Sequence, residues 1–161
     1  MKRNVARSTL LISVAALCLG VVPAVQAADH CSNAKAAGTW GLTLTGTLIL
    51  PTGPVPGAAV ARATIDAAGN ISGTEARNVG GGFANETLTG SWTVNSDCTA
   101  TLTVNIYESG VLVRTSVLAA VFVDDSNKVR MVQESLTLPD GTTIPVVITA
   151  DGNKLFSAHH D

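Results

Sequence analysis

After the N-terminal region, apolar and polar residues alternate along the chain with a period of two. In the segment 40–50 one set of alternate positions is apolar and the other is rich in threonine: Trp40, Leu42, Leu44, Gly46, Leu48 and Leu50 against Gly41, Thr43, Thr45, Thr47 and Ile49. Successive side chains point to opposite faces of a β-strand, so this segment should have one buried and one solvated face. Helical periodicity is nearly absent, and the sequence therefore predicts an all-β domain.

Clusters of Gly, Pro, Asn and Asp divide the chain into eight expected strands. They are expected at 40–50, 58–65, 71–77, 84–94, 99–108, 111–123, 128–138 and 143–150, with a short further segment at 154–157. Ser109-Gly110, Asp140-Gly141 and Asp151-Gly152-Asn153 tolerate positive φ and are expected turns. Pro51, Pro54 and Pro56 mark the longest early connection. Short hairpins favour an eight-stranded antiparallel up-and-down barrel, which has no exposed edges; a β-sandwich is the alternative, with 51–57 as its crossing connection.

Hairpin registers test which residues share the inner face, because a slip of one residue inverts the faces. A turn centred on Ser96 pairs Trp92 with Ala100, Gly90 with Leu102 and Leu88 with Val104. A two-residue Ser109-Gly110 turn pairs Ile106 with Val113, Val104 with Thr115 and Leu102 with Val117. The Asp140-Gly141 turn pairs Met131 with Ala150, Gln133 with Ile148 and Ser135 with Val146. All three turns predict one common apolar interior.

That register leaves an apolar set on the outer face of 111–123, namely Leu112, Leu118, Ala120 and Phe122. A solvated barrel wall is normally more polar. A homo-oligomer formed through this outer face near Leu118 and Phe122 is therefore expected.

The first 27 residues have the three parts of a secretory signal peptide. A basic start with Lys2, Arg3 and Arg7 precedes an apolar run at 10–22 and small residues around Ala27. Cleavage there leaves a single barrel domain, 28–161, with no membrane span after processing, in a periplasmic or extracellular location. Its seven basic and twelve acidic residues give a formal charge of −5. Such a surface repels phosphate backbones, so no nucleic-acid partner is expected.

Cys31 and Cys98 are the cysteines that remain after cleavage. Two cysteines in a secreted domain usually pair, which predicts one disulfide joining the N-terminal lead-in to the turn after residue 94. Two free thiols or a metal pair are the alternative.

The histidines, His30, His159 and His160, all lie in terminal segments. The barrel therefore offers no imidazole to a Ser-His-Asp triad or a histidine-ligated metal. No phosphate-binding loop is found, and neither a metal nor another cofactor is expected.

Three charged residues within strands are the candidate ligand-binding group. An Asp66–Asn70 turn that pairs Ile65 with Ile71 directs Glu75 and Arg77 inward, and alternation in the next strand brings Glu86 to the same barrel end. Two carboxylates around an arginine could fix a polar ligand group or shift the pKa of one glutamate for proton transfer; a salt bridge at the rim is the alternative. Further candidates, each with a structural alternative, are Gln133, Trp40 and Trp92.

The stretch Gly90-Ser91-Trp92-Thr93-Val94-Asn95-Ser96-Asp97-Cys98-Thr99, preceded by 65–73, resembles small exported bacterial proteins of unknown function. These share an aromatic-Thr-Val-Asn-x-Asp-Cys-Thr turn and are similar to eight-stranded barrels of the allene oxide cyclase or calycin type. The resemblance implies the fold and, in the cyclase-like barrels, a hydrophobic substrate in the lumen. No cyclase catalytic motif matches this chain, so no catalytic residue is carried over.

Three functions fit these observations. The first is an exported, non-catalytic module that holds a small apolar or amphipathic ligand in the lumen. The second is an isomerase or cyclase that uses Glu75 or Glu86 as acid or base. The third is a structural or adhesive envelope protein that uses its outer wall, which predicts that the lumen has no cavity and that the protein binds a macromolecular partner. The volume of the lumen distinguishes the third function from the other two.

Overall fold

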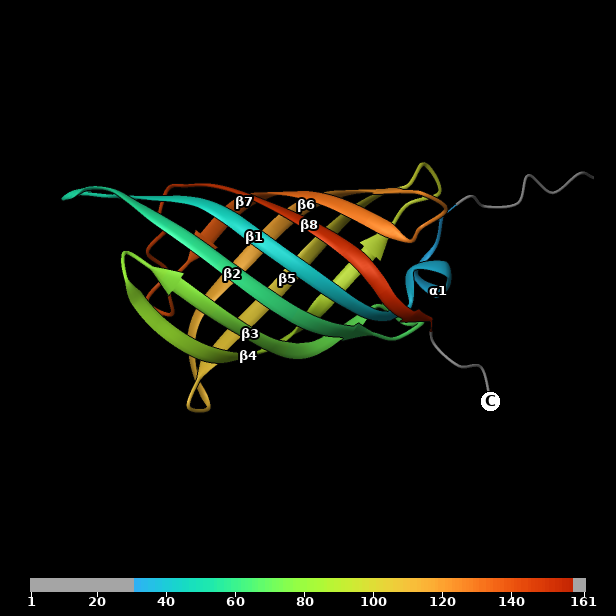
Figure 1. Ribbon diagram of the computed structural model, residues 1–161, viewed down its shortest axis with the longest axis horizontal. Coiled ribbons are helices and arrows are strands. Elements are labelled where there is room, and N and C mark those ends of the chain that lie inside the picture. Colours follow the sequence, from blue (N-terminus) through green and yellow to red (C-terminus); the bar gives the residue numbers. More distant parts are fainter. Residues whose placement is uncertain (1–30, 158–161) are drawn as a thin grey trace, which may run out of the picture.

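Residues 31–157 are described by the computed structural model, so the predicted signal peptide at 1–27 and the three histidines lie outside the described residues. The described chain is a closed barrel of eight antiparallel strands in sequential order (Figure 1). The strands are β1 Gly38–Leu50, β2 Gly53–Ile65, β3 Asn70–Val79, β4 Gly82–Val94, β5 Thr99–Glu108, β6 Val111–Val123, β7 Lys128–Thr137 and β8 Val146–Ser157. The prediction of an all-β up-and-down barrel is confirmed, and the sandwich alternative is wrong.

Each strand pairs with the next, and β8 closes the barrel on β1 from Gly38–Ser157 to Leu48–Val146. The predicted Ile65–Ile71 register is confirmed. Between β4 and β5 the pairing differs by two positions from the prediction, with Trp92 opposite Leu102. A shift of two leaves every side chain on its predicted face, because side chains alternate with a period of two.

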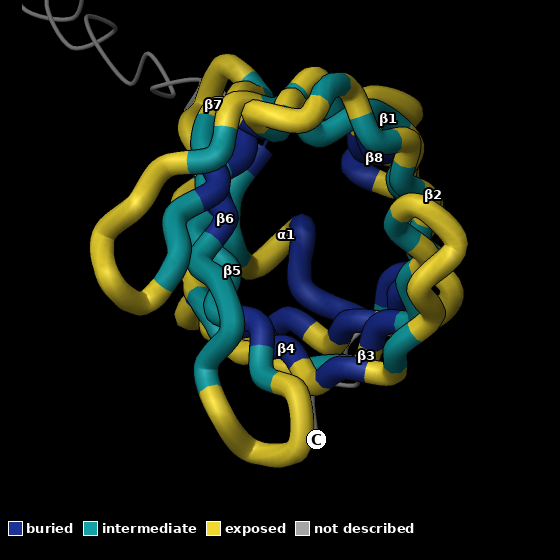
Figure 2. The backbone as a smooth tube through the Cα atoms, turned by 90° about the vertical axis from the view of Figure 1, so that its left-hand side faces the viewer, coloured by how far each residue is buried: buried dark blue, intermediate teal, exposed yellow. Residues whose placement is uncertain are grey.

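A short helix, α1 (Asn33–Ala36), closes one end of the barrel and was not predicted from the sequence (Figure 2). The Ser32 side chain caps it by accepting from the Lys35 backbone N–H at 3.2 Å. Ala36 is fully buried, and its carbonyl accepts from the Trp40 indole N–H at 3.0 Å. The first residues of β1 therefore hold the helix at this closed end of the barrel, which we call the floor.

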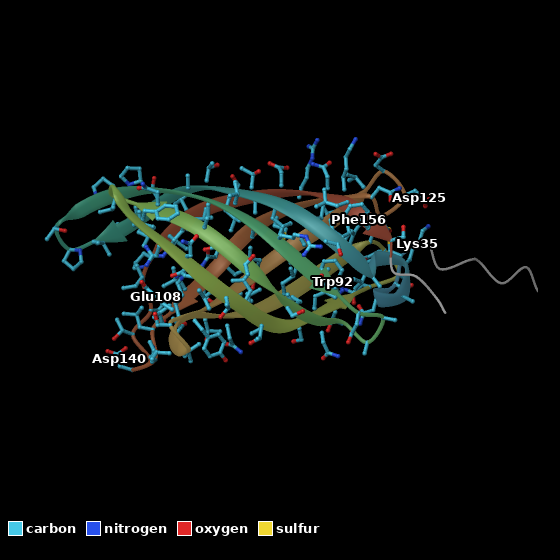
Figure 3. All side chains as sticks on the ribbon, turned by 60° about the horizontal axis from the view of Figure 1, so that its bottom comes forward. Lys35, Trp92, Glu108, Asp125, Asp140 and Phe156 are labelled. Carbon is cyan, nitrogen blue, oxygen red and sulfur yellow. A yellow bond between two sulfur atoms is a disulfide. The ribbon has the colours of Figure 1, made fainter. Side chains whose placement is uncertain are left out.

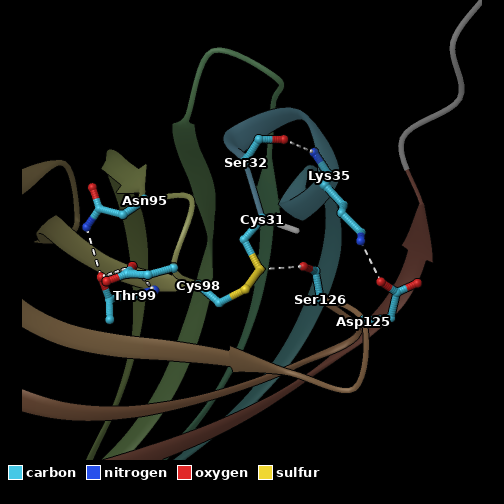
Figure 4. Close-up of a disulfide and its surroundings, with 9 residues drawn as sticks. Cys31, Ser32, Lys35, Asn95, Cys98, Thr99, Asp125 and Ser126 are labelled. Carbon is cyan, nitrogen blue, oxygen red and sulfur yellow. Dashed lines mark hydrogen bonds and ion pairs between the residues drawn. A yellow bond between two sulfur atoms is a disulfide. The ribbon is translucent and has the colours of Figure 1, made fainter. Parts of the chain in front are cut away.

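The predicted disulfide joins this lead-in to the β4–β5 turn (Figure 4). Cys31 and Cys98 are bonded, with Cα atoms 5.0 Å apart. Next to the bond, the Ser126 hydroxyl lies 3.4 Å from the Cys31 sulfur, and Lys35 forms an ion pair with Asp125. Three separate segments thus meet beneath the closed end.

The β5–β6 hairpin corrects the prediction for β6. Its register shifts between Ile106 and Tyr107, so Ile106 lies opposite Arg114. In a β-bulge two residues of one strand oppose one residue of the other. Relative to the predicted pairing, β6 is shifted by one residue, which exchanges the inner and outer faces of the strand after the bulge. Leu118, Ala120 and Phe122 are therefore buried, and Val117 no longer lies on the inner face.

The expected oligomer surface near Leu118 and Phe122 is consequently wrong. These side chains are only 6% and 4% exposed, and Phe122 packs against the tryptophans of the core. They face the inside of the barrel and cannot contact a second copy of the chain.

Two expected connections are parts of strands instead. Pro54 and Pro56 lie in β2, opposite Ile49 and Thr47. The Pro56 carbonyl accepts from Gly80 N–H at 2.9 Å, on the side where β3 has already ended. The proline nitrogens therefore face the side on which β3 has ended. Proline has no N–H to donate, and no neighbouring strand on that side needs one, so the strand tolerates proline there.

The expected Asp151-Gly152-Asn153 turn lies within β8. Asn153 pairs with Lys128 and Gly152 with Val129, and the β7–β8 ladder ends at Val132–Thr149. The predicted Met131–Ala150 pair is confirmed, but the ladder does not extend to Gln133 or Ser135. Instead, the Ile144 N–H donates to the Leu136 carbonyl at 2.8 Å, so the 138–145 connection runs back along β7.

Among residues 31–157, no helix has the length and apolar character needed to cross a membrane.

Candidate ligand-binding site

The barrel interior is hollow and contains a cavity of about 410 Å³. The cavity runs from Trp40 and Trp92 beside α1 to Leu50, Val79 and Leu138 near the opposite hairpin ends. Figure 2 looks along the barrel with α1 at its far end, and Figure 3 places Trp92 toward α1 and Glu108 and Asp140 at the other end. The volume falls within the usual range of small-molecule sites, about 300–1,000 Å³.

Alternating small and large residues create this space. On β2 the inward positions Ala59, Ala61 and Ala63 lie opposite Leu44, Leu42 and Trp40 of β1. All six line the cavity. The alanines leave room beside β3, whereas the leucines and the tryptophan fill the β1 side.

An aromatic cluster forms the floor. The rings of Trp40, Trp92 and Phe122 meet edge to face, with centroids 5.0 to 5.9 Å apart. Such contacts add stability beyond the burial of area. The indole N–H of Trp92 is buried and has no hydrogen-bond partner within residues 31–157.

A charged cluster lies on the wall that runs from β3 to β6, and its residues come from β3, β4 and β6. Glu86 has a fully buried side chain, and its Oε1 accepts from Arg77 Nε and from an Arg114 terminal nitrogen, both at 2.7 Å. The other Arg114 terminal nitrogen donates to Glu86 Oε2 at 2.7 Å and to Glu75 Oε1 at 2.8 Å. Arg114 thus bridges the two glutamates, and paired charges of this kind tolerate burial.

The environment shifts the pKa values of these two glutamates in opposite directions. Burial raises the pKa of Glu75 above its ordinary value; the Arg114 charge opposes this rise, and the Glu86 carboxylate adds to it. Burial acts in the same direction on Glu86, but the hydrogen bonds and charges of Arg114 and Arg77 outweigh it and hold the pKa of Glu86 below its ordinary value. Of the two carboxyls, Glu75 is therefore the one that is protonated more readily.

Arg77 retains hydrogen-bonding capacity that Arg114 has largely used. Within the described part of the chain, its terminal nitrogens make one charged contact, 3.7 Å from Glu108 Oε2, which is beyond hydrogen-bond distance. The Glu108 side chain is 47% exposed, so water screens this contact. Arg77 lines the cavity and lies opposite Ala59 and Ala84, whose short side chains leave space around it.

A second polar group lies further along β6 and β7. The Gln133 amide donates to the Ser116 hydroxyl and to the Ser135 carbonyl, both at 3.0 Å. Gln133 is 8% exposed and lines the cavity, as does Ser116. With Glu75, Arg77 and Arg114, these are the five polar residues in an otherwise apolar lining.

All six residues predicted as ligand-binding lie in the barrel interior: Glu75, Arg77, Glu86, Gln133, Trp40 and Trp92. Five of them line the cavity, whereas Glu86 lies behind the two arginines. Arg114 was missed because the predicted register turned it outward. Charge balance could have indicated it, since two inward glutamates beside a single arginine leave one buried carboxylate without a partner.

Within residues 31–157, no group of three or more histidine, cysteine, aspartate or glutamate side chains is arranged to hold a metal ion.

Comparison with known proteins supports the fold. No protein-family profile and no curated protein matches the chain. One similar solved structure is described as "Structure of EF1p2_mFAP2b bound to DFHBI"; the match has a TM-score of 0.53 and 11% identity, and covers 76% of this chain and 98% of the other. At that identity the likeness shows a shared barrel fold alone, and the resemblance to allene oxide cyclases stays a prediction.

Proposed function

We propose that this protein is an exported binding module that holds one small apolar or amphipathic molecule in the lumen of its barrel. The observation that carries the proposal is the cavity itself: about 410 Å³, lined almost entirely by apolar side chains, with charged groups gathered on one wall. A concave apolar site with a few convergent polar groups is the usual form of a small-molecule site.

The two ends of the barrel are held together by different numbers of contacts, and this difference supports the same proposal. The floor is held by the disulfide, α1 and three packed aromatic rings. At the opposite end the β7–β8 ladder has already stopped, at Val132–Thr149. A ligand would therefore enter between the hairpin ends while the floor stays intact.

The similar barrel also supports the proposal, since its structure is described as bound to DFHBI. That protein shares 11% identity with this chain, so the identity of its ligand is not transferred. The structural or adhesive alternative required a filled interior and does not match the hollow lumen.

A titration with Nile red, a neutral apolar dye, tests the proposal. The wild-type protein should bind one dye molecule saturably, with a rise in dye fluorescence. Ala61→Phe places a large ring in the lumen and should weaken binding at least tenfold. Val60→Phe is the matched control: Val60 is the adjacent residue on β2, is 58% exposed and points outward, so its affinity should be unchanged.

Ala59→Leu, a smaller addition to the lumen, keeps the test decisive if Ala61→Phe disturbs folding. It should give an intermediate loss of dye affinity at unchanged circular dichroism. Equal affinity in the wild type, Ala59→Leu and a folded Ala61→Phe would rule out the lumen as the site. Independently of the dye titration, native mass spectrometry of the protein isolated from the cells that make it shows whether a natural ligand is retained.

An isomerase or cyclase is the second candidate, favoured by Glu75. This carboxyl lines the cavity, and burial raises its pKa above the ordinary glutamate value, as a group that transfers a proton requires. Glu75→Gln keeps the shape of the side chain and removes the titrating group. If a substrate of the protein is turned over by this variant at the wild-type rate, Glu75 is not the acid or base.

Export is part of the proposal. It is supported by the signal-peptide pattern at 1–27 and by the disulfide, which requires an oxidising compartment to persist. Fractionation of producing cells, with the N-terminus of the protein sequenced, tests it. Protein in the cytoplasm that still begins at Met1 would refute this part.

A further inference from the structure

We infer that the ligand of this lumen is a monoanionic amphipath, with a carboxylate head held by Arg77 and an apolar body that reaches toward the aromatic floor. This inference rests on the proposed function and specifies the chemical class of its ligand.

The hydrogen bonds within the charged cluster identify Arg77 as the group that meets the head. Glu86 accepts three hydrogen bonds and is fully buried, so it has little capacity for a ligand. Both terminal nitrogens of Arg114 are committed to glutamates. Arg77 uses its Nε on Glu86, and its two terminal nitrogens lack a hydrogen-bond partner within residues 31–157.

These remaining donors specify the kind of head. The two terminal nitrogens of a guanidinium form an edge that pairs with both oxygens of a carboxylate. A cationic head would meet this guanidinium with like charge. A neutral hydroxyl would use one donor and leave the charge unpaired.

The charge of the whole cluster is consistent with an anion. Two arginines balance two glutamates when both carboxyls are ionised, and protonation of Glu75 leaves the group with a net positive charge. Glu108 is a weak competitor, because its contact with Arg77 is 3.7 Å long and its side chain is half exposed. A ligand carboxylate would replace it at closer range and inside an apolar wall, where charge pairs are stronger.

The register sets the length of the apolar body. Six residues of β3 separate Arg77 from Ile71 near the floor, roughly 20 Å of strand at 3.3 Å per residue. Strand tilt in a barrel of about 40° reduces this to about 15 Å along the axis. The inward residues between these levels are Glu75 and Gly73, opposite Ala61 and Ala63, so apart from Glu75 this part of the path is lined by small residues.

Three ten-carbon probes that differ only in the head group test the inference at pH 7: decanoate, decan-1-ol and decylamine. Trp40 and Trp92 are the two tryptophans of the chain, and both line the cavity, so quenching or a shift of tryptophan fluorescence reports occupancy. Decanoate should bind at least tenfold more tightly than either other probe, since charge-assisted hydrogen bonds are the strong ones.

The Arg77→Gln variant should lower decanoate affinity to about that of decan-1-ol, and its effect on decan-1-ol affinity should be much smaller. Arg130→Gln is the matched control, because Arg130 is exposed on β7 and the substitution removes the same charge outside the lumen. Its affinity for decanoate should equal that of the wild type.

Each other result overturns the inference and separates it from the proposed function. If decan-1-ol or decylamine binds as tightly as decanoate, or Arg77→Gln binds decanoate normally, the lumen binds apolar molecules but Arg77 does not select a carboxylate. If none of the three probes binds, the carboxylate inference fails, and the Nile red titration decides whether lumen binding stands.

Discussion

Replacing Arg114 with methionine should destabilise the protein strongly and in a pH-dependent way. Arg114 donates three hydrogen bonds of 2.7 to 2.8 Å to Glu75 and Glu86, and its side chain is 16% exposed. Methionine keeps the apolar stem of the side chain in the lumen wall and removes the guanidinium. The substitution therefore tests the charge and hydrogen bonds of Arg114 at nearly constant volume.

The burial of the partners sets the size of the effect. The side chains of Glu86 and Glu75 are 0% and 8% exposed, so water can replace little of what the arginine supplies. Removing one partner of a buried ion pair costs about 3–5 kcal/mol. Glu86 keeps its bond from Arg77, so we expect the lower end, about 3 kcal/mol at pH 7.

Urea unfolding followed by tryptophan fluorescence measures this loss. With a slope of about 1–3 kcal/mol per molar urea, the midpoint should fall by about 1–3 M at pH 7. The loss should shrink toward pH 4: without Arg114 the pKa values of both glutamates rise in the folded state, so protonation restores stability as the pH falls. Arg114→Lys should lose less, because a lysine keeps the charge but not the forked geometry.

Arg130→Met, an exposed arginine on β7, is the control and should stay within about 0.5 kcal/mol of the wild type. If Arg114→Met were as stable as this control, the buried cluster would have no energetic role. If its loss were the same at pH 4 and pH 7, the effect would come from packing and the electrostatic reasoning would be refuted.

The remaining predictions concern the disulfide, Glu75 and the β6 bulge. The bond between Cys31 and Cys98 spans 67 positions, and replacing both cysteines with serine should lower the free energy of unfolding by about 4 kcal/mol in the chain-entropy model. Urea unfolding measures this loss. Equal stability of the two proteins would show that the bond does not restrict the unfolded chain. Glu75 has a raised pKa in the folded state, so its contribution to stability is full below the ordinary glutamate pKa of about 4.3 and is lost as the pH rises through the folded-state value. The wild type should therefore lose stability relative to Glu75→Gln as the pH rises from 4 to 8, and a constant difference in urea midpoint would contradict this. Deletion of Val113 should remove the bulge yet keep Arg114 opposite Ile106 in a regular hairpin. The lost valine should lower the free energy of unfolding by about 1–2 kcal/mol. Loss of the pH dependence assigned to Glu75 would show that Arg114 had moved.

The β2–β3 hairpin was predicted correctly because residues of the turn itself form the hydrogen bonds and adopt the backbone angles that fix its geometry. Asp66 accepts from the Asn70 backbone N–H at 2.8 Å, and Gly69 has the positive φ that the turn requires. With that turn fixed, alternation alone places Glu75 and Arg77 on the inner face. Two of the four charged residues of the cluster follow from a single local turn.

The face of β6 could not be predicted in the same way. The even positions Leu112, Leu118, Ala120 and Phe122 and the odd positions Val113, Val117, Ala119 and Val121 are both apolar sets, so burial of either set satisfies the pattern. The bulge decides between them, and its residue carries no distinctive turn signal. Val113 and Arg114 are consecutive, yet both line the cavity, as the two residues of a bulge can.

The sequence also could not predict that the lumen is hollow. Eight strands enclose either a packed core or a small ligand cavity, and the choice depends on how far the closing strands are staggered. That stagger is fixed by the β8–β1 register, which joins residues 98 to 119 positions apart. No local turn determines it, so the apolar inward residues alone were equally consistent with a filled barrel.

The bulge links the fold to the proposed chemistry. If the same residues, Val113 included, formed a regular hairpin, Arg114 would face solvent, and Arg77 would have to neutralise two buried glutamates alone. With the bulge, Arg114 binds both glutamates, so Arg77, which also lines the cavity, commits only its Nε to Glu86. The bulge at Val113 thus places Arg114 on the inner face, where it shares the neutralisation of the two glutamates with Arg77.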